Sequence, residues 1–167
     1  MKILDEKFKD NKIRYVFQCM LATLAVFIVL MILDAIANAA IIASLGASSF
    51  IAFTMPKADV SRARFLVGGY VVGVFSGSLC FGLSVIPAIS QILNNQELSR
   101  VIFSAAAVGL AIFLMVILDL EHPPAGGVAL GLVLNEFSLL SVAVILIGIV
   151  SLSVLKAVLK PFLINLL

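Results

Sequence analysis

The chain has 167 residues, of which 63% are hydrophobic and 12% charged, and its formal net charge is +2. A water-soluble domain carries about 25% charged residues, and a chain of this length has too little interior to bury so much apolar surface. The composition therefore excludes a soluble globular domain, and the small net charge gives no support for nucleic-acid binding. We expect one all-α domain embedded in a membrane.

Four uncharged runs are long enough to cross a hydrocarbon layer of ~30 Å as helices. They cover residues 15–33, 65–86, 101–118 and 137–155. Two shorter apolar stretches lie between them, at residues 39–55 and 123–134. The first contains the segment LGASS and the second opens with two prolines, so we expect both short helices to be interrupted or to begin part-way through the membrane.

The positive charges indicate whether the short stretches cross. If both cross, ten of the eleven Lys and Arg residues lie on the side of the N-terminus, and only Arg100 lies on the other. If both are re-entrant, leaving four passages, then Lys57, Arg62 and Arg64 move to the opposite side. Because positive residues collect on the cytoplasmic side, the sequence predicts six passages with both termini cytoplasmic.

Six passages in the order long–short–long, long–short–long divide into two halves, at about residues 15–86 and 99–158. Each half has three passages, so the second half enters the membrane from the opposite side, as in inverted-repeat transporters. At an offset of 85 positions, ILD at 32–34 matches ILD at 117–119, and LG at 45–46 matches LG at 130–131. We expect a cytoplasmic segment at 1–14, one transmembrane domain at 15–160 and a tail at 161–167.

Glycines at four-residue spacing mark places where helices approach closely. The third passage carries Gly69, Gly73 and Gly77, and the short fifth passage repeats the pattern with Gly127 and Gly131. We interpret both sets as packing devices.

The two interruptions predict the transport site. A helix that begins inside the bilayer leaves its first N–H groups without partners, and an anion can bind there, helped by the partial positive charge of the helix start. The alternative is that both segments are tight packing turns without a ligand. The substrate-binding residues that we expect come from both segments: Gly46, Ala47, Ser48, Ser49, His122, Pro123, Pro124, Ala125 and Gly126.

His122 is the only histidine of the chain and stands directly before the second interruption. Histidine titrates near neutral pH, so His122 could couple proton movement to anion movement together with Asp119 and Glu121. The alternatives are that it only lines the site, or that it is solvated at the interface. Cys19 and Cys80 lack the spacing of a metal or redox site, so we expect no metal and no cofactor.

The tripeptide His122-Pro123-Pro124, extended to HPPAGG, resembles the HPP family of integral membrane proteins, which is named for it. The LGASS segment, Pro56 and the pair Gly68-Gly69 follow in the family's order, and the likeness covers residues from about 15 to 160. The resemblance implies a multi-pass membrane protein whose chloroplast and cyanobacterial relatives are regarded as nitrite transporters.

We therefore expect a bacterial inner-membrane transporter of a small inorganic anion, nitrite first, that is not an enzyme. Its expected partners are the anion, the lipid bilayer and a second or third copy in a homo-oligomer. The alternative is an assembly or regulatory subunit of the membrane that transports nothing. An intramembrane enzyme built on His122 is disfavoured, because no nucleophile or metal ligand stands at a telling spacing.

Overall fold

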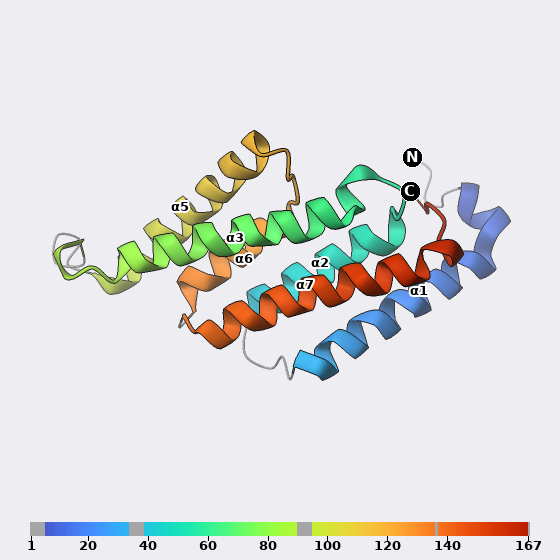
Figure 1. Ribbon diagram of the computed structural model, residues 1–167, viewed down its shortest axis with the longest axis horizontal. Helices are drawn as coiled ribbons and strands as arrows, with labels where there is room; N and C mark the ends of the chain where they lie inside the picture. Colours follow the sequence, from blue (N-terminus) through green and yellow to red (C-terminus); the bar gives the residue numbers. More distant parts are fainter. Residues whose placement is uncertain (1–5, 34–38, 90–94, 136, 167) are drawn as a thin grey trace.

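The computed structural model describes residues 6–33, 39–89, 95–135 and 137–166, and this part of the chain contains helices and no strands. Six helices match the predicted runs in order (Figure 1). They are α1 (Glu6–Leu33), α2 (Ala39–Thr54), α3 (Ala63–Ser84), α5 (Gln96–Ile117), α6 (Pro124–Leu134) and α7 (Leu139–Leu159), with short 3-10 turns η1 (Asp59–Ser61) and η2 (Lys160–Phe162). The all-helical prediction is confirmed. Asp34 lies outside the described residues.

Side-chain caps fix the starts of two helices. Asn95 Oδ1 accepts hydrogen bonds from the N–H groups of Glu97 and Leu98 at 2.9 and 3.1 Å, at the start of α5. Ser138 Oγ accepts from the N–H of Ser141 at 3.0 Å, at the start of α7. These caps satisfy amides that a membrane would leave without partners.

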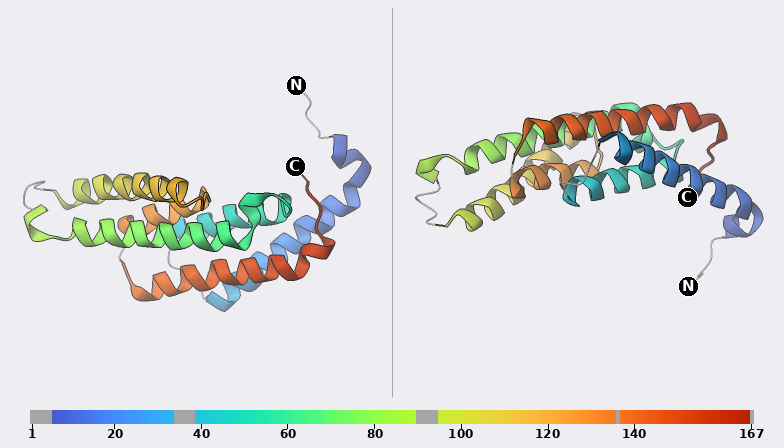
Figure 2. Two further views of the ribbon diagram at one scale, coloured as in Figure 1. Left: turned by 45° about the horizontal axis from the view of Figure 1, so that its top comes forward. Right: turned by 90° about the horizontal axis from the view of Figure 1, so that it is seen from below.

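Successive helices run in opposite directions (Figures 1 and 2). The hairpin of α3 and α5 shows this: Ser99 Oγ donates to Ser84 O at 3.4 Å at one end of the bundle. At the other end Arg64 pairs with Asp119 at 3.1 Å. Asp119 has a φ of 53°, the left-handed conformation that commonly follows a helix end, and there the chain turns back towards α6.

The start of α1, the connection between α2 and α3 and the C-terminal tail gather at one end of the bundle. Tyr15 Oη donates to Leu166 O at 2.7 Å, and the N–H of Leu166 donates to Thr54 O at 2.8 Å. The N–H of Lys57 donates to Asn165 Oδ1 at 3.0 Å. The basic residues of these segments therefore share one end, as the predicted cytoplasmic side requires.

The number of membrane passages stays a prediction. Among the described residues, three helices are long and apolar enough to cross a membrane: Ala63–Ser84, Gln96–Ile117 and Leu139–Phe162. Helices α2 and α6 have 16 and 11 residues. At ~1.5 Å per residue they rise about 24 and about 16 Å, less than the hydrocarbon layer.

The helix contacts bear on the predicted repeat. Helix α1 packs against α2 and α7 as α5 packs against α6 and α3. Helix α7 packs against α2 as α3 packs against α6. Exchanging the two halves therefore maps these pairs onto one another, and the inverted repeat itself stays a prediction.

The predicted interruption of the first short segment, at residues 39–55, is wrong. Helix α2 runs from Ala39 to Thr54 without a break, through Gly46 and the two serines that follow it. A glycine inside a helix costs only about 1 kcal/mol relative to alanine. Packing of α2 against α1, α6 and α7 outweighs that cost.

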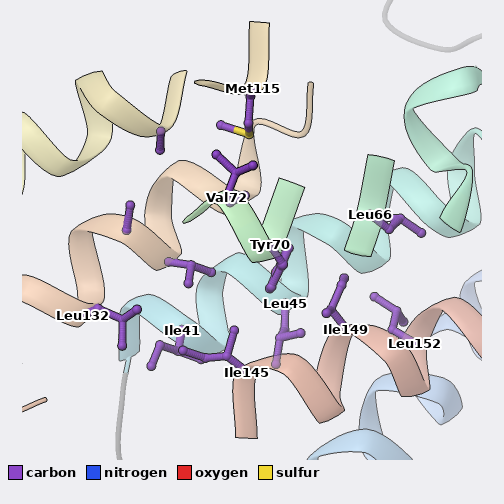
Figure 3. Close-up of a cluster of buried hydrophobic side chains, with 14 of the residues drawn as sticks. Ile41, Leu45, Leu66, Tyr70, Val72, Met115, Leu132, Ile145, Ile149 and Leu152 are labelled. Carbon is purple, nitrogen blue, oxygen red and sulfur yellow. The ribbon is translucent and has the colours of Figure 1, made fainter. Parts of the chain in front are cut away.

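The core lies where α2 and α6 meet α3 and α7 (Figure 3). Its largest members include Ile41, Leu45, Leu66, Tyr70, Ile145, Ile149 and Leu152. A Cβ atom on Gly73 would lie 2.5 Å from Ala125 O, and one on Gly77 would lie 2.9 Å from Ala129 O. The glycines of α3 therefore bring its main chain against the main chain of α6, and the predicted packing strip is confirmed.

Candidate functional site

A buried polar cluster connects the two short helices. Ser48 Oγ of α2 lies 2.8 Å from His122 Nε2 and 2.9 Å from Tyr70 Oη. Each of these three residues is 0% exposed. Ser48, Tyr70 and His122, here called the polar cluster, join α2, α3 and the segment directly before α6.

Two glycines of α3 seat His122 in this cluster. A Cβ atom on Gly69 would lie 2.5 Å from His122 Cβ, and one on Gly68 would lie 2.7 Å from Leu120 Cδ2. Only a residue without a side chain lets the segment before α6 lie this close to α3. Tyr70 follows directly, and its ring centroid lies 5.6 Å from that of His122.

The two ring nitrogens of His122 have different surroundings. Nε2 contacts Ser48, whereas Nδ1 has no hydrogen-bond partner of normal geometry within the described residues. The main chain of Val60 in η1 lies next to the ring. The turn η1 therefore contacts the polar cluster at the end of the bundle that holds the C-terminal tail.

A second hydroxyl extends the contact between α2 and α6. Ser44 lies one turn before Ser48 in α2. A Cβ atom on Gly127 would lie 2.5 Å from Ser44 Oγ. One turn further, a Cβ atom on Gly131 would lie 3.0 Å from Ala40 Cβ. The hydroxyl-bearing face of α2 thus packs against the glycine face of α6.

The first amides of α6 are already used within the chain. Pro123 and Pro124 have no N–H, the N–H of Ala125 donates to His122 O at 2.9 Å, and that of Gly126 donates to Pro123 O at 3.1 Å. The N–H groups around Gly46 lie inside the continuous helix α2. The expectation that exposed amide ends of these two segments face a shared anion is therefore wrong.

The other predicted residues of α2 lie apart from the cluster. Gly46 and Ala47 are exposed, and a Cβ atom on Gly46 would meet nothing within 4 Å. Ser49 is buried, and its Oγ donates to Leu45 O at 2.8 Å. Of the predicted α2 residues, the structure thus brings only Ser48 to His122.

The two carboxylates proposed for proton coupling also lie outside the polar cluster. Asp119 forms an exposed ion pair with Arg64, and Glu121 is exposed. No three His, Cys, Asp or Glu side chains in the described part of the chain lie close enough to hold a metal ion.

A cavity of about 680 Å³ lies between α5 and α6. Its wall on the α6 side includes Glu121, His122, Pro123, Gly126 and Gly127. Its wall on the α5 side is apolar and consists of Val108, Ile112, Met115 and Val116. Of the predicted residues of the second segment, His122, Pro123 and Gly126 border this cavity, whereas Ala125 packs against Gly73 of α3.

Sequence reasoning missed Tyr70, Gln18 and Lys156. All three are buried polar residues inside or beside apolar runs. Gln18 Nε2 donates to Phe53 O and to Ile164 O, which ties α1 to the end of α2 and to the tail. The sequence did contain a signal for them. A solitary polar residue in an apolar run costs folding free energy unless its polar group has hydrogen-bond partners, so such a residue predicts a buried polar contact.

The chain matches the family model described as HPP, transmembrane region, over residues 9–166. No curated protein and no solved structure matches it. The matched range includes α2, α3 and α6 and hence the whole polar cluster. The chain therefore belongs to the HPP transmembrane family.

Proposed function

We propose that this protein transports a small inorganic anion across the membrane through a site at the polar cluster. Nitrite is the first candidate for this anion. The contact between Ser48 Oγ and His122 Nε2 carries the proposal. It joins α2 to the segment directly before α6 inside a membrane bundle, where polar side chains are costly and mark substrate paths. The bacterial inner membrane, with both termini cytoplasmic, is part of the proposal.

The chemistry of the cluster suits a small anion. The hydroxyls of Ser48 and Tyr70 and an imidazole N–H of His122 can each donate a hydrogen bond to an anion oxygen or halide. The acidic side chains of Asp119 and Glu121 do not contact the cluster, although Glu121 lines the neighbouring cavity. A proton taken up by His122 would add a positive charge and couple anion binding to pH.

Access to the fully buried cluster requires a change of conformation. The interchangeable helix pairs of the two halves support rocking of one half against the other, the usual motion of inverted-repeat transporters. The cavity between α5 and α6 already borders His122 and supplies room on that side. Pro123 and Gly126 would shape this wall of the path, and Pro124 and Ala125 would hold the turn between them.

Flux into liposomes tests the proposal. Vesicles with the purified full chain should take up nitrite above empty vesicles, in a panel that also holds nitrate, formate and chloride. Ser48→Ala should reduce uptake about tenfold or more, the effect of losing a hydrogen bond worth ~1.5 kcal/mol. Ser49→Ala is the matched control, since its hydroxyl donates to Leu45 O of its own helix.

Two outcomes would revise the proposal. Folded protein that moves none of the four anions would favour the non-transporting assembly or regulatory subunit. Uptake with the same kinetics from pH 5 to pH 8 would remove proton coupling by His122 while leaving anion transport intact.

A further inference from the structure

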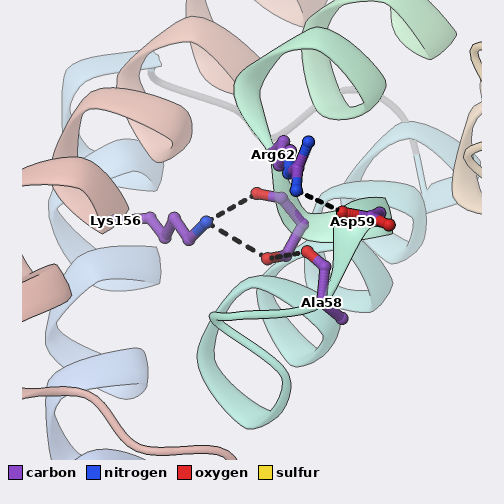
Figure 4. A network of polar contacts seen from close by, with 5 residues as sticks. Ala58, Asp59, Arg62 and Lys156 are labelled. Carbon is purple, nitrogen blue, oxygen red and sulfur yellow. Dashed lines mark hydrogen bonds and ion pairs between the residues drawn. The ribbon is translucent and has the colours of Figure 1, made fainter.

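Lys156 places a buried ammonium group against the turn η1 (Figure 4). The residue lies in α7 and is 7% exposed. Its Nζ donates to Ser61 O at 2.7 Å and to Ser61 Oγ at 3.1 Å. The hydroxyl of Ser61 in turn donates to Ala58 O at 2.9 Å. All partners of this ammonium group among the described residues are therefore neutral.

Two positive groups, those of Arg62 and Lys160, lie near the ammonium group of Lys156, and no carboxylate of the described residues pairs with it. The nearby Asp59 is already bound to Arg62 at 2.6 Å (Figure 4). A buried charge is stable when it is paired, and an ammonium group has three N–H donors, of which Ser61 takes two. An anion would satisfy the third donor and balance the charge.

The position of Lys156 relates it to the polar cluster. Ser61 accepts from Lys156 Nζ and directly follows Val60, whose main chain lies next to the His122 ring. The turn η1 therefore contacts both the ammonium group of Lys156 and the polar cluster.

We propose that Lys156 and Ser61 form a second binding site, for a small inorganic anion, at the entrance to the path. Its place in the path rests on the proposed transport function, whereas anion binding at Lys156 does not. The third ammonium N–H of Lys156 holds the anion, while the carbonyl and hydroxyl oxygens of Ser61 accept the other two and orient the group. Passage from this site to the polar cluster then requires η1 to move.

Thermal unfolding of the full chain in detergent tests the site. Sodium nitrite should raise the Tm relative to sodium gluconate at the same ionic strength, because a ligand that binds the folded state stabilises it. Lys156→Met should need about tenfold more nitrite for the same shift, the loss expected for one hydrogen bond to a charged group. The measurement is repeated in Ser48→Ala, where the polar cluster is impaired.

Lys160→Met is the matched control, since Lys160 lies one helical turn further along and is exposed. It should leave the nitrite dependence within about twofold of wild type, as expected for an exposed charge. Lys156→Gln is a second replacement that removes the charge but keeps an N–H donor for Ser61, and it serves if the methionine variant does not fold.

The outcomes separate this inference from the proposed function. If the Lys156 variants show the same nitrite dependence as Lys160→Met, Lys156 only ties η1 to α7 and the site is refuted. If the nitrite-dependent Tm shift depends on Lys156 but liposomes take up no anion, the second binding site is supported and the proposed transport function is refuted. Uptake by the wild type together with an unchanged nitrite response in the Lys156 variants refutes the second site and leaves transport intact.

Discussion

Helices α2 and α6 are the two short apolar helices of the bundle, yet they contribute to the polar cluster in different ways. Helix α2 is continuous and presents hydroxyls, with Ser48 against His122 and Ser44 against Gly127. Helix α6 begins at Pro124 and presents a bare main chain. Helix α2 therefore supplies the hydrogen-bonding groups, whereas α6 supplies the space in which they lie.

The largest effect is expected from closing that space. Gly73→Ala would place a Cβ atom 2.5 Å from Ala125 O and 3.2 Å from Ala125 C, both main-chain atoms that no rotamer change can move. Overpacking costs about 1–3 kcal/mol and more where the backbone must shift. We expect a large fall in Tm in detergent and loss of nitrite uptake.

Gly82→Ala is the control for this change, since it lies on the same helix and its Cβ atom would meet nothing within 4 Å. Equal Tm values for the two variants would show that α3 and α6 are not held together by close main-chain contact.

The next effect concerns the hydroxyl side of the comparison. Ser48→Ala leaves Nε2 of the buried His122 without its partner, which costs about 1–3 kcal/mol. His122→Ala should then cost less in the Ser48→Ala background than in wild type, with a coupling energy of about 0.5–3 kcal/mol. Thermal unfolding of the four chains of this double-mutant cycle gives the value. Additive effects would mean that the two side chains merely lie near one another.

A smaller effect is expected where the two helices meet directly. Gly127→Ala would bring a Cβ atom within 2.5 Å of Ser44 Oγ, while Ser44 Cβ would stay at 3.8 Å, an ordinary contact. We expect a loss of about 1 kcal/mol, since the hydroxyl can turn only at some cost. Ser44→Ala should restore the Tm of Gly127→Ala, because it removes the one atom that clashes. A double variant no more stable than Gly127→Ala would place the clash elsewhere.

The same contrast explains what the sequence could predict. Six helices follow from the lengths of the apolar runs, and Ser48 and His122 follow from polar residues beside glycine and proline. Whether Gly46 breaks a helix depends on packing from α1, α6 and α7, which no local pattern contains. The role of Ser61 was equally hidden, because its partner Lys156 lies 95 residues away in the chain.

Tyr70 shows how a site residue escapes notice in an uninterrupted apolar run. It lies among hydrophobic neighbours, and its hydroxyl meets Ser48 only after α2 and α3 have packed together. The local signal was the pair Gly68-Gly69 directly before it, whose missing side chains admit Leu120 and His122. A glycine pair before a lone tyrosine in a membrane helix therefore indicates that another segment packs closely beside the tyrosine and its hydroxyl.

The smallest effect separates the two tyrosines of the chain. Tyr70→Phe removes only the hydroxyl that lies 2.9 Å from Ser48 Oγ, and Ser48 keeps its contacts with His122 and with Ser44 O. A single such hydrogen bond is worth about 0.5–1.5 kcal/mol, so the protein should fold and the KM for nitrite should rise a few-fold. Tyr15→Phe also removes a hydroxyl, one that donates to Leu166 O in the tail, and it should leave the KM unchanged. If both variants shift the KM alike, the hydroxyl of Tyr70 acts through stability and does not bind the anion.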